Sequence, residues 1–186
     1  MISNLAVVKT QTIGNRVVIG PFSVIAEDVR LGNGVVIHPH VVIESGVEIG
    51  DGVEVFPGAY IGKEPKGAGA LARLPVFERR IVIGAHTSIG PHAVIYYDVE
   101  IGESTLIGDG ASIREQCRIG ARVIVGRHVT INYNVQIGSG TKIMDHSWLA
   151  GNMLIENDAF ISGGVLTAND DALGRHEYDE GRVQGP

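Results

Sequence analysis

The chain has 186 residues, a formal net charge of −6 and only 5% aromatic residues, and the negative charge argues against a broad nucleic-acid surface. No apolar run approaches the length of a membrane span and the N-terminal sequence lacks the design of a signal peptide, so we expect a cytoplasmic protein with no membrane partner. The single cysteine, Cys117, excludes an internal disulfide and occupies a position where small residues recur, which predicts a packed core side chain.

An aliphatic residue recurs at every sixth position in the first part of the chain. These residues are Ile13, Ile19, Ile25, Leu31, Ile37, Ile43, Ile49, Val55 and Ile61. A small or β-branched residue follows four positions after nearly all of them, as Val17 follows Ile13. A period of six does not match the 3.6 residues per turn of an α-helix, but it suits short strands joined by tight corners. The pattern therefore predicts an all-β fold, the hexapeptide repeat of a parallel β-helix.

A second period, of 18 residues, sets the number of strands in each coil. One column of glycine and one of proline recur at this spacing: Gly14, Gly32, Gly50, Pro21, Pro39 and Pro57. Residues that repeat at this spacing lie above one another, so each coil holds three hexapeptides and has a triangular section. Asn or Asp follows each of these glycines, and we expect Gly, Asn and Asp to supply the positive φ that tight corners need.

The repeat breaks once, between Ile61 and Ile83, where residues 62–82 are rich in Gly, Pro and basic residues. This segment predicts a loop that protrudes from one corner while the stack of coils continues beneath it. The repeat resumes at Ile83 with both columns in phase. We therefore expect one β-helix domain, residues 1–166, with the protruding loop 62–82. Residues 167–186 are polar and predict an irregular C-terminal segment, from which further coils can follow.

The three corners and three faces of the predicted coil differ in composition. The second corner carries several histidines, and the third corner carries Tyr, Arg, Glu and Asn, where turn chemistry alone favours Gly, Asn or Asp. The faces that flank the second corner have partly apolar outward residues, for example Val18, Leu106 and Trp148. Two adjoining apolar faces suit packing about a threefold axis. We therefore predict a homotrimer with the second corner pointing inward.

Residues 13–166 resemble the hexapeptide acyltransferases. They repeat that family's motif of an aliphatic residue, a glycine, two variable residues and a small residue, as in residues 89–93. The resemblance implies a left-handed parallel β-helix, an exception to the right-handed rule for parallel crossovers. It also implies a trimer that moves an acyl group from a coenzyme A or carrier-protein thioester to an amine or hydroxyl.

Residues 61–65, 111–120 and 130–135 are most similar to the nucleotide-sugar N-acetyltransferases. This resemblance implies an enzyme that takes acetyl-CoA as donor substrate, needs no metal and acylates the amino group of a nucleotide-linked amino sugar. The chain also resembles the acyltransferase that begins lipid A synthesis, whose catalytic His corresponds to Gly151 here. That base does not carry over, and His146 is the nearest substitute.

Two histidines of the second corner are the candidates for the catalytic base. His128 and His146 are 18 residues and therefore one coil apart, which is roughly 5 Å at strand spacing. Two imidazoles this close disfavour double protonation, which favours a neutral base near pH 7. Trp148 lies beside His146 and can line a sugar or pantetheine pocket. The alternative is that exposed corners tolerate His and that both side chains are only solvated.

The third corner supplies polar candidates. Asn134 and Asn152 stack at 18-residue spacing. With Asn132, they are placed to hydrogen-bond sugar hydroxyls or to hold a reacting carbonyl. An asparagine ladder that stabilises the corner explains them equally well. Glu115 is a poor turn residue and is predicted to be catalytic.

The protruding loop is basic, and Lys63 and Arg79 are predicted to bind the phosphates of the nucleotide. The alternative is a solvated basic loop on an acidic protein. If trimers form, the second corner of one copy faces a side or the third corner of its neighbour. The catalytic and binding groups then meet in a composite site between subunits.

Three other functions remain as alternatives. Carbonic anhydrase relatives of the family bind zinc through three His, but His92 is two coils from His128, too far for one tetrahedral ion within a chain. A sugar acyltransferase of the lipid A type, dependent on acyl carrier protein, is the second. A non-catalytic structural β-helix subunit is the third.

Overall fold

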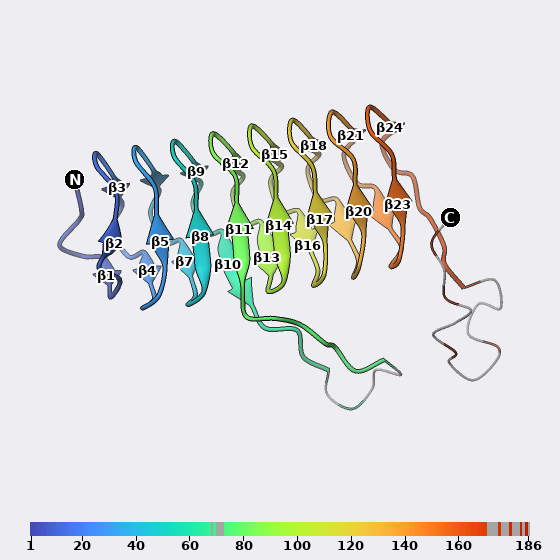
Figure 1. The fold of residues 1–186 in the computed structure, drawn as a ribbon, viewed down its shortest axis with the longest axis horizontal. Coiled ribbons are helices and arrows are strands. Elements are labelled where there is room, and N and C mark those ends of the chain that lie inside the picture. The colour runs from blue at the N-terminus through green and yellow to red at the C-terminus, as the bar shows by residue number, and fades with distance from the viewer. Residues whose placement is uncertain are drawn as a thin grey trace.

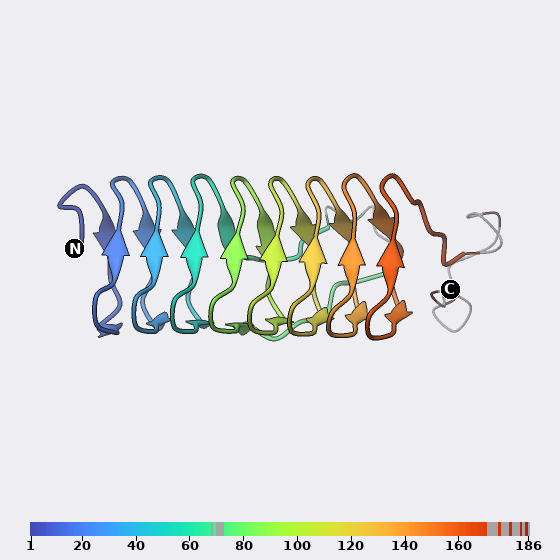
Figure 2. The ribbon, with the colours of Figure 1, turned by 90° about the horizontal axis from the view of Figure 1, so that it is seen from above.

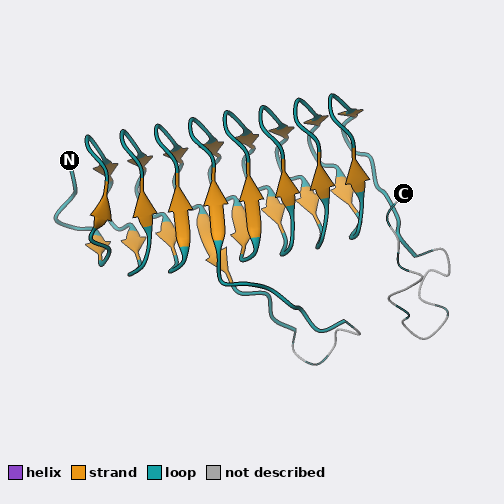
Figure 3. Cartoon of the chain, viewed as in Figure 1, coloured by secondary structure: helices purple, strands orange, loops and turns teal. Residues whose placement is uncertain are grey.

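Short parallel strands stack into three flat sheets that form the walls of a triangular prism (Figure 1). The computed structural model describes residues 1–67, 69, 73–170, 175, 179, 183 and 185. Strands and turns make up this described part (Figure 3), in which no helix is long and apolar enough to cross a membrane. The predicted left-handed parallel β-helix with three hexapeptides per coil is confirmed.

Each coil passes through three corners and three sheets, and each sheet has eight strands. The first sheet lies between the first and second corners and contains β3 (Val18–Ile19), β6 (Val36–Ile37), β9 (Glu54–Val55), β12 (Ser88–Ile89), β15 (Leu106–Ile107), β18 (Ile124–Val125), β21 (Lys142–Ile143) and β24 (Phe160–Ile161). The second sheet lies between the second and third corners and contains β1 (Val7–Val8), β4 (Val24–Ile25), β7 (Val42–Ile43), β10 (Tyr60–Lys63), β13 (Val94–Tyr96), β16 (Ser112–Ile113), β19 (Thr130–Ile131) and β22 (Trp148–Leu149). The third sheet closes the coil with β2 (Thr12–Ile13), β5 (Arg30–Leu31), β8 (Val47–Ile49), β11 (Ile81–Ile83), β14 (Val99–Ile101), β17 (Arg118–Ile119), β20 (Gln136–Ile137) and β23 (Leu154–Ile155).

Alternation along the strands builds the core. In a two-residue strand such as β3, Val18 points outward and is 40% exposed, whereas Ile19 points inward and is 2% exposed. Ile19 pairs with Ile37, 18 residues on, so identical positions of successive coils stack. The predicted aliphatic columns therefore form one continuous core along the axis of the prism.

The protruding loop interrupts the hexapeptide repeat but not the stacking of the coils. Val55 pairs with Ile89 across the break, so the register of the core continues on its far side. The flanking strands reach further into the predicted loop than the period indicates, because β10 extends to Lys63 and β11 begins at Ile81. The described residues between Lys63 and Ile81 therefore lie outside the strands, and they leave the third corner toward the C-terminal coils (Figure 1).

The corners correct one prediction about backbone conformation. Positive φ occurs at the third position of each corner, for example 58° at Arg16 and 67° at Gly34, and not at the glycine that opens the first corner. Gly14 has a different reason to be glycine, because a Cβ there would lie 2.5 Å from the backbone carbon of Gly32 in the next coil. Close stacking of coils, and not left-handed backbone, explains this glycine column.

Leu166 and part of the C-terminal segment lie against the last coil. Leu166 forms a parallel bridge with Trp148, and the Asn152 amide donates a hydrogen bond to the carbonyl oxygen of Val183 at 2.6 Å. Val183 is 9% exposed. Figure 2 shows the coils in regular succession, with the described residues that follow β24 leading away beyond the last of them. These contacts cover part of the edge that an open solenoid would leave free.

Candidate active site

The two predicted histidines stack on each other at the second corner. His128 and His146 take φ of 55° and 63°, and their rings lie 5.3 Å apart with 14° between the planes. Gly110, one coil earlier, leaves room for this arrangement, because a Cβ there would lie 2.5 Å from Nδ1 of His128. Both imidazoles are exposed, so a ligand can reach them.

Asp145 ties this corner to the preceding coil. Its Oδ1 accepts a hydrogen bond from the backbone N–H of Arg127 at 2.8 Å, and its Oδ2 accepts one from Arg127 Nε at 2.9 Å. The backbone hydrogen bond is the main reason that the pKa of Asp145 is lowered from its ordinary value. A charged carboxylate therefore stands next to His146 in the chain.

Apolar side chains flank the histidine pair on the two adjoining sheets. Trp148 is 38% exposed at the start of β22 and Phe160 is 65% exposed at the start of β24. Leu166, the bridge partner of Trp148, is 75% exposed. An apolar surface of this kind suits the apolar part of a ligand or another protein surface.

The third corner contains a fully buried carboxylate. Glu115 is 0% exposed, and its Oε1 accepts hydrogen bonds from Arg73 at 2.9 Å and from Arg114 at 3.1 Å. Arg73 comes from the protruding loop, its side chain is 13% exposed, and it also donates to Oε1 of Gln116 at 3.1 Å. The predicted catalytic carboxylate thus faces two guanidinium groups, and the period of the repeat gave no sign that Arg73 would reach it.

Tyr133 occupies the same corner one coil later. The guanidinium carbon of Arg73 lies 4.0 Å from the centre of the Tyr133 ring, and that of Arg114 lies 6.0 Å from it. In the next coil, Gly151 lies directly against the ring, because a Cβ on Gly151 would be 2.6 Å from Cζ of Tyr133. The sequence patterns do not single out Tyr133 as a site residue, although a tyrosine at a tight corner is a signal that turn chemistry leaves unexplained.

The three predicted asparagines are hydrogen-bonded to the chain itself. Asn134 donates to Oδ1 of Asn152 at 2.9 Å, and Asn152 donates onward to Val183. Asn132 donates to the carbonyl oxygen of Leu149 at 3.0 Å. The asparagine ladder considered as the structural alternative is therefore present, and it uses one of the two N–H donors of each side-chain amide.

The predicted phosphate-binding residues of the loop have partners within the chain. Arg79 pairs with Glu64 at 3.1 Å and lies 5.6 Å from the centre of the Tyr97 ring. Lys63 Nζ lies 4.7 Å from the centre of the Tyr96 ring. Both cations therefore pack against tyrosines of the third corner, and Lys63 does so with no ion pair to a carboxylate in the described part of the chain.

The candidates divide between two edges of the second sheet. His128 lies just before β19 and Tyr133 just after it, so the width of the sheet separates the second corner from the third. The histidines and Trp148 gather at one edge. Glu115, the asparagines, Lys63 and Arg79 gather at the other edge. A single chain does not bring the two groups into one pocket.

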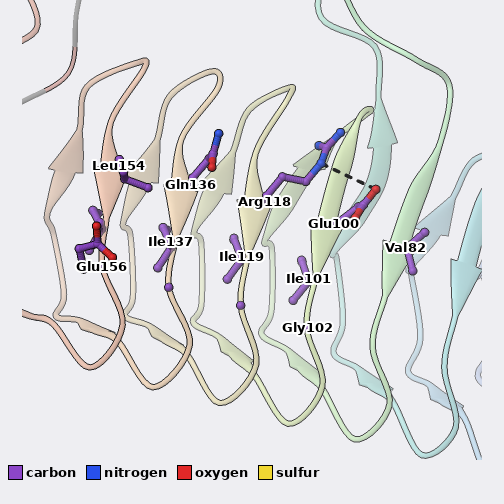
Figure 4. A pocket seen from close by; sticks show the side chains of 13 residues that line it. Val82, Glu100, Ile101, Gly102, Arg118, Ile119, Gln136, Ile137, Leu154 and Glu156 are labelled. Atoms are coloured by element: carbon purple, nitrogen blue, oxygen red, sulfur yellow. Dashed lines mark ion pairs between the residues drawn. The ribbon is translucent and has the colours of Figure 1, made fainter.

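A groove on the third sheet contains none of these predicted site residues. It has a volume of about 410 Å³ and is lined by the outward residues of that sheet, including Glu100, Arg118, Gln136 and Leu154. Figure 4 shows Arg118 paired with Glu100, with 3.7 Å between Nε and Oε1. The groove is an open, partly charged face of the prism.

Metal-ligating side chains do not cluster in the described residues, where no group of three His, Cys, Asp or Glu side chains could hold an ion. His92 shares the second corner with His128, and Gly110 occupies the coil between them. His92 and His128 are therefore two coils apart, as the 18-residue period predicts.

Comparison with known protein families finds the hexapeptide repeat. The model described as bacterial transferase hexapeptide (six repeats) matches residues 12–45, 29–63, 80–115 and 98–133, which is more than half of the chain. No curated protein sequence matches the chain.

Several solved structures share the fold. UDP-N-acetylglucosamine acyltransferase of Francisella novicida is 26% identical over 89% of this chain, with a TM-score of 0.68, and the chain spans only 62% of its length. The enzyme of that name from Campylobacter jejuni is 22% identical over 98% of this chain and 80% of its own, with a TM-score of 0.74. Perosamine N-acetyltransferase of Caulobacter crescentus, solved with CoA and GDP-perosamine, is 20% identical over 68% of this chain and 51% of its own, with a TM-score of 0.53. At these lower identities the likeness is one of fold.

Proposed function

The chain belongs to the bacterial transferase hexapeptide family, and from this premise we propose that it moves an acyl group from a thioester donor to the amino group of a nucleotide-linked sugar. The observation that carries the proposal is the family match, supported by the 26% identity to the Francisella novicida acyltransferase, whose name gives a nucleotide sugar as its substrate. Acetyl-CoA is the proposed donor.

The reaction requires a base for the amine and a fixed position for the thioester. His146 is the proposed base, and the ring of His128 stacks on it with 5.3 Å between the ring centres. Trp148 is proposed to line the pocket for the pantetheine or the sugar. Its exposed ring lies on the sheet that adjoins this corner.

The third corner is the proposed acceptor site. Asn132 and Asn134 are assigned to the sugar hydroxyls through the side-chain oxygens that remain after their amides have donated within the chain. Asn152 supports Asn134 in this role. Lys63 and Arg79 are assigned to the phosphates.

The part that Glu115 plays in this proposal differs from the catalytic carboxylate expected from its sequence position. Its oxygens are taken up by Arg73 and Arg114. A fully buried carboxylate that accepts three hydrogen bonds from two guanidinium groups is placed to hold those groups and not to meet a substrate. Its role is therefore to hold Arg73, and with it the loop, against the corner.

In this proposal a homotrimer brings together the base at the second corner and the acceptor site at the third corner. Packing of the first and second sheets about a threefold axis covers their exposed apolar residues, and in the proposed assembly the second corner of one copy faces a side or the third corner of the next. The base and the acceptor site then face each other across the subunit boundary. The proposed active site is therefore incomplete in one chain.

The test is a thiol-release assay with acetyl-CoA against a panel of nucleotide-linked amino sugars. We expect thiol release that depends on the acceptor, and a loss of at least 100-fold in kcat for His146→Ala if it is the base. His40→Ala is the matched control, because His40 occupies the same corner position with φ of 62° and stacks on Phe22.

Two results would redirect or contradict the proposal. Turnover with acyl carrier protein thioesters, and none with acetyl-CoA, assigns the donor to the lipid A type of chemistry. Absence of thiol release with both donors across the panel contradicts an acyltransferase. Full kcat in His146→Ala removes the base assignment and leaves the reaction class in place.

A further inference from the structure

Gly151 is explained by the tyrosine ring that lies against it. Its backbone is not among those with positive φ, so conformational freedom does not require glycine here. A Cβ on Gly151 would lie 2.6, 2.7 and 2.9 Å from Cζ, Cε2 and Cε1 of Tyr133. Glycines such as Gly108 instead close against the backbone of the next coil. Any larger residue at 151 would therefore push the phenol end of the Tyr133 ring out of its place.

A buried ion pair between the loop and the third corner holds the Tyr133 ring in place. Arg73 packs at 4.0 Å from the ring centre, and the fully buried Glu115 fixes Arg73 by a 2.9 Å hydrogen bond. Withdrawing a carboxylate and a guanidinium from water is costly, so such pairs are weak devices for stability alone. Here they immobilise one side chain at the surface of the corner.

The hydroxyl of Tyr133 differs from those of two other tyrosines in its hydrogen bonding. Among the described residues it has no hydrogen-bond partner, whereas the Tyr97 hydroxyl donates to the carbonyl oxygen of Ser45 at 3.0 Å and that of Tyr60 to Glu44 at 3.2 Å. No buried side-chain polar atom in this part of the chain lacks a partner, so the Tyr133 hydroxyl is not fully enclosed by the protein. A rigidly supported ring that ends in an unused hydroxyl is the arrangement expected of a functional group.

The surroundings of this hydroxyl favour negative charge. Two guanidinium groups, of Arg73 and Arg114, lie 4.0 and 6.0 Å from the ring centre. Both share the one carboxylate of Glu115. One positive charge in this cluster is therefore left without a balancing carboxylate among these residues. An oxyanion that forms next to the phenol is stabilised by this excess charge.

We infer that Tyr133 is a catalytic residue of the proposed acyl transfer, and that its O–H donates a hydrogen bond to the carbonyl oxygen of the thioester. The inference rests on the proposed function. The amine lone pair forms the new bond to the carbonyl carbon, and the carbonyl π pair moves to oxygen, where Tyr133 stabilises it. The oxyanion then reforms the C=O bond as the C–S bond breaks. The amine proton passes to the base, and from the base to the departing thiolate.

The first test removes only the hydroxyl. Tyr133→Phe keeps the ring, its contact with Arg73 and its packing on Gly151, so we expect unchanged thermal unfolding and acceptor KM. The kcat is expected to fall about 100-fold, the loss typical of one oxyanion donor. Tyr60→Phe is the matched control, because it removes a hydroxyl that only bonds Glu44. Its kcat is expected to stay within about twofold of wild type.

The second test uses the coupling between Tyr133 and Gly151. Gly151→Ala is expected to lower kcat in the wild-type background by displacing the phenol. In the Tyr133→Phe background the same alanine is expected to have little further effect on kcat, because the hydroxyl is already gone. Equal kcat losses from Gly151→Ala in the two backgrounds would overturn the role.

The outcomes separate this inference from the proposed function. A wild-type protein that releases thiol together with a fully active Tyr133→Phe variant overturns the role of Tyr133 and leaves the acyltransferase intact. A wild-type protein that releases no thiol with any donor overturns the proposed function and this role with it. A lowered Tm for Tyr133→Phe with unchanged kcat assigns the hydroxyl to structure.

Discussion

Cys117 shows how completely the core encloses a polar atom. Its side chain is 0% exposed, and its Sγ lies 2.9 Å from the carbonyl oxygen of Asn132. Burial raises the pKa of the Cys117 thiol to about 12, since a thiolate would lose its solvation in the core. The thiol therefore stays protonated near neutral pH and packs as a small apolar side chain, as its place among small residues predicts.

We expect native Cys117 not to react with Ellman's reagent at pH 8, whereas the protein unfolded in guanidinium reacts within minutes. Because the folded pKa is raised, this thiol contributes stability that is fully present below its unfolded pKa. That contribution is lost as the pH rises from about 9 toward about 12. Cys117→Ala protein supplies the background absorbance. Labelling of the native protein at the rate of a free thiol would contradict the burial of Cys117.

At the scale of elements, the protruding loop is attached to the third corner at two places. Arg73 pairs with the buried Glu115, and Phe77 stacks on Tyr97 with 6.1 Å between ring centres and 10° between planes. The Tyr97 ring is itself buried. Because the loop is fixed at two points, we expect its described part to stay packed against the third corner.

Breaking the buried pair is expected to release the loop. Arg73→Met and Glu115→Gln each leave a buried group without its charged partner, which costs about 3–5 kcal/mol locally. We expect trypsin to cleave after Lys66, whose side chain is 77% exposed, at least tenfold faster than in wild type. Limited proteolysis followed by mass spectrometry of the fragments measures this.

Arg127→Met is the control for the loop variants. It breaks the ion pair with Asp145, in which the arginine side chain is 65% exposed, and exposed pairs contribute only about 0–1 kcal/mol. Cleavage after Lys66 is expected to stay at the wild-type rate in this variant. Equal protection of the loop in Arg73→Met and wild type would show that the pair with Glu115 does not hold it.

At the scale of the whole molecule, the three faces of the prism differ in charge. At the third sheet, Arg80, which directly precedes β11, bridges Glu48 and Glu100 at 3.7 and 3.5 Å, and Arg118 also pairs with Glu100. The outward residues of the first and second sheets include exposed Val18, Val24 and Leu106. A charged ladder suits a solvated face and apolar residues suit a covered one, which supports the proposed packing through the first and second sheets.

We expect sedimentation at micromolar concentration to give three times the mass of one chain. Leu106→Lys places a charge on the first sheet and is expected to shift the mass toward the monomer. Gln136→Lys places the same charge on the third sheet, where it is expected to leave the mass unchanged. A monomeric wild-type protein would contradict the assembly.

The proposed composite site adds a second readout of the same assembly. Refolding a mixture of His146→Ala and Tyr133→Phe chains places an intact second corner against an intact third corner in some trimers. Random mixing in equal amounts is expected to restore about a quarter of wild-type activity. Activity that stays at the level of the two variants alone would indicate that the two corners do not share a site.

Much of the candidate site could be located from the 18-residue period, but its contacts could not. The period placed His128 above His146 and Asn134 above Asn152, because residues at equal positions of successive coils are neighbours whatever their side chains. It gave no information on Arg73, which lies outside the repeat and contacts a residue 42 positions away. The period also does not explain why residue 151 is glycine. The structure does, because the ring of Tyr133 lies against it.

The sequence by itself determined the β-helix, its three sheets and the inward columns, because a short strand and a tight corner repeat with the period of the chain. Alternation within each strand then decides which side chain enters the core. Only the tertiary structure decided where positive φ falls in the corners, and why Gly14 is glycine, since the space at Gly14 depends on the approach of the next coil. It also decided that Glu115 is buried beneath Arg73, because the path of a loop follows side-chain contacts that no periodic signal records.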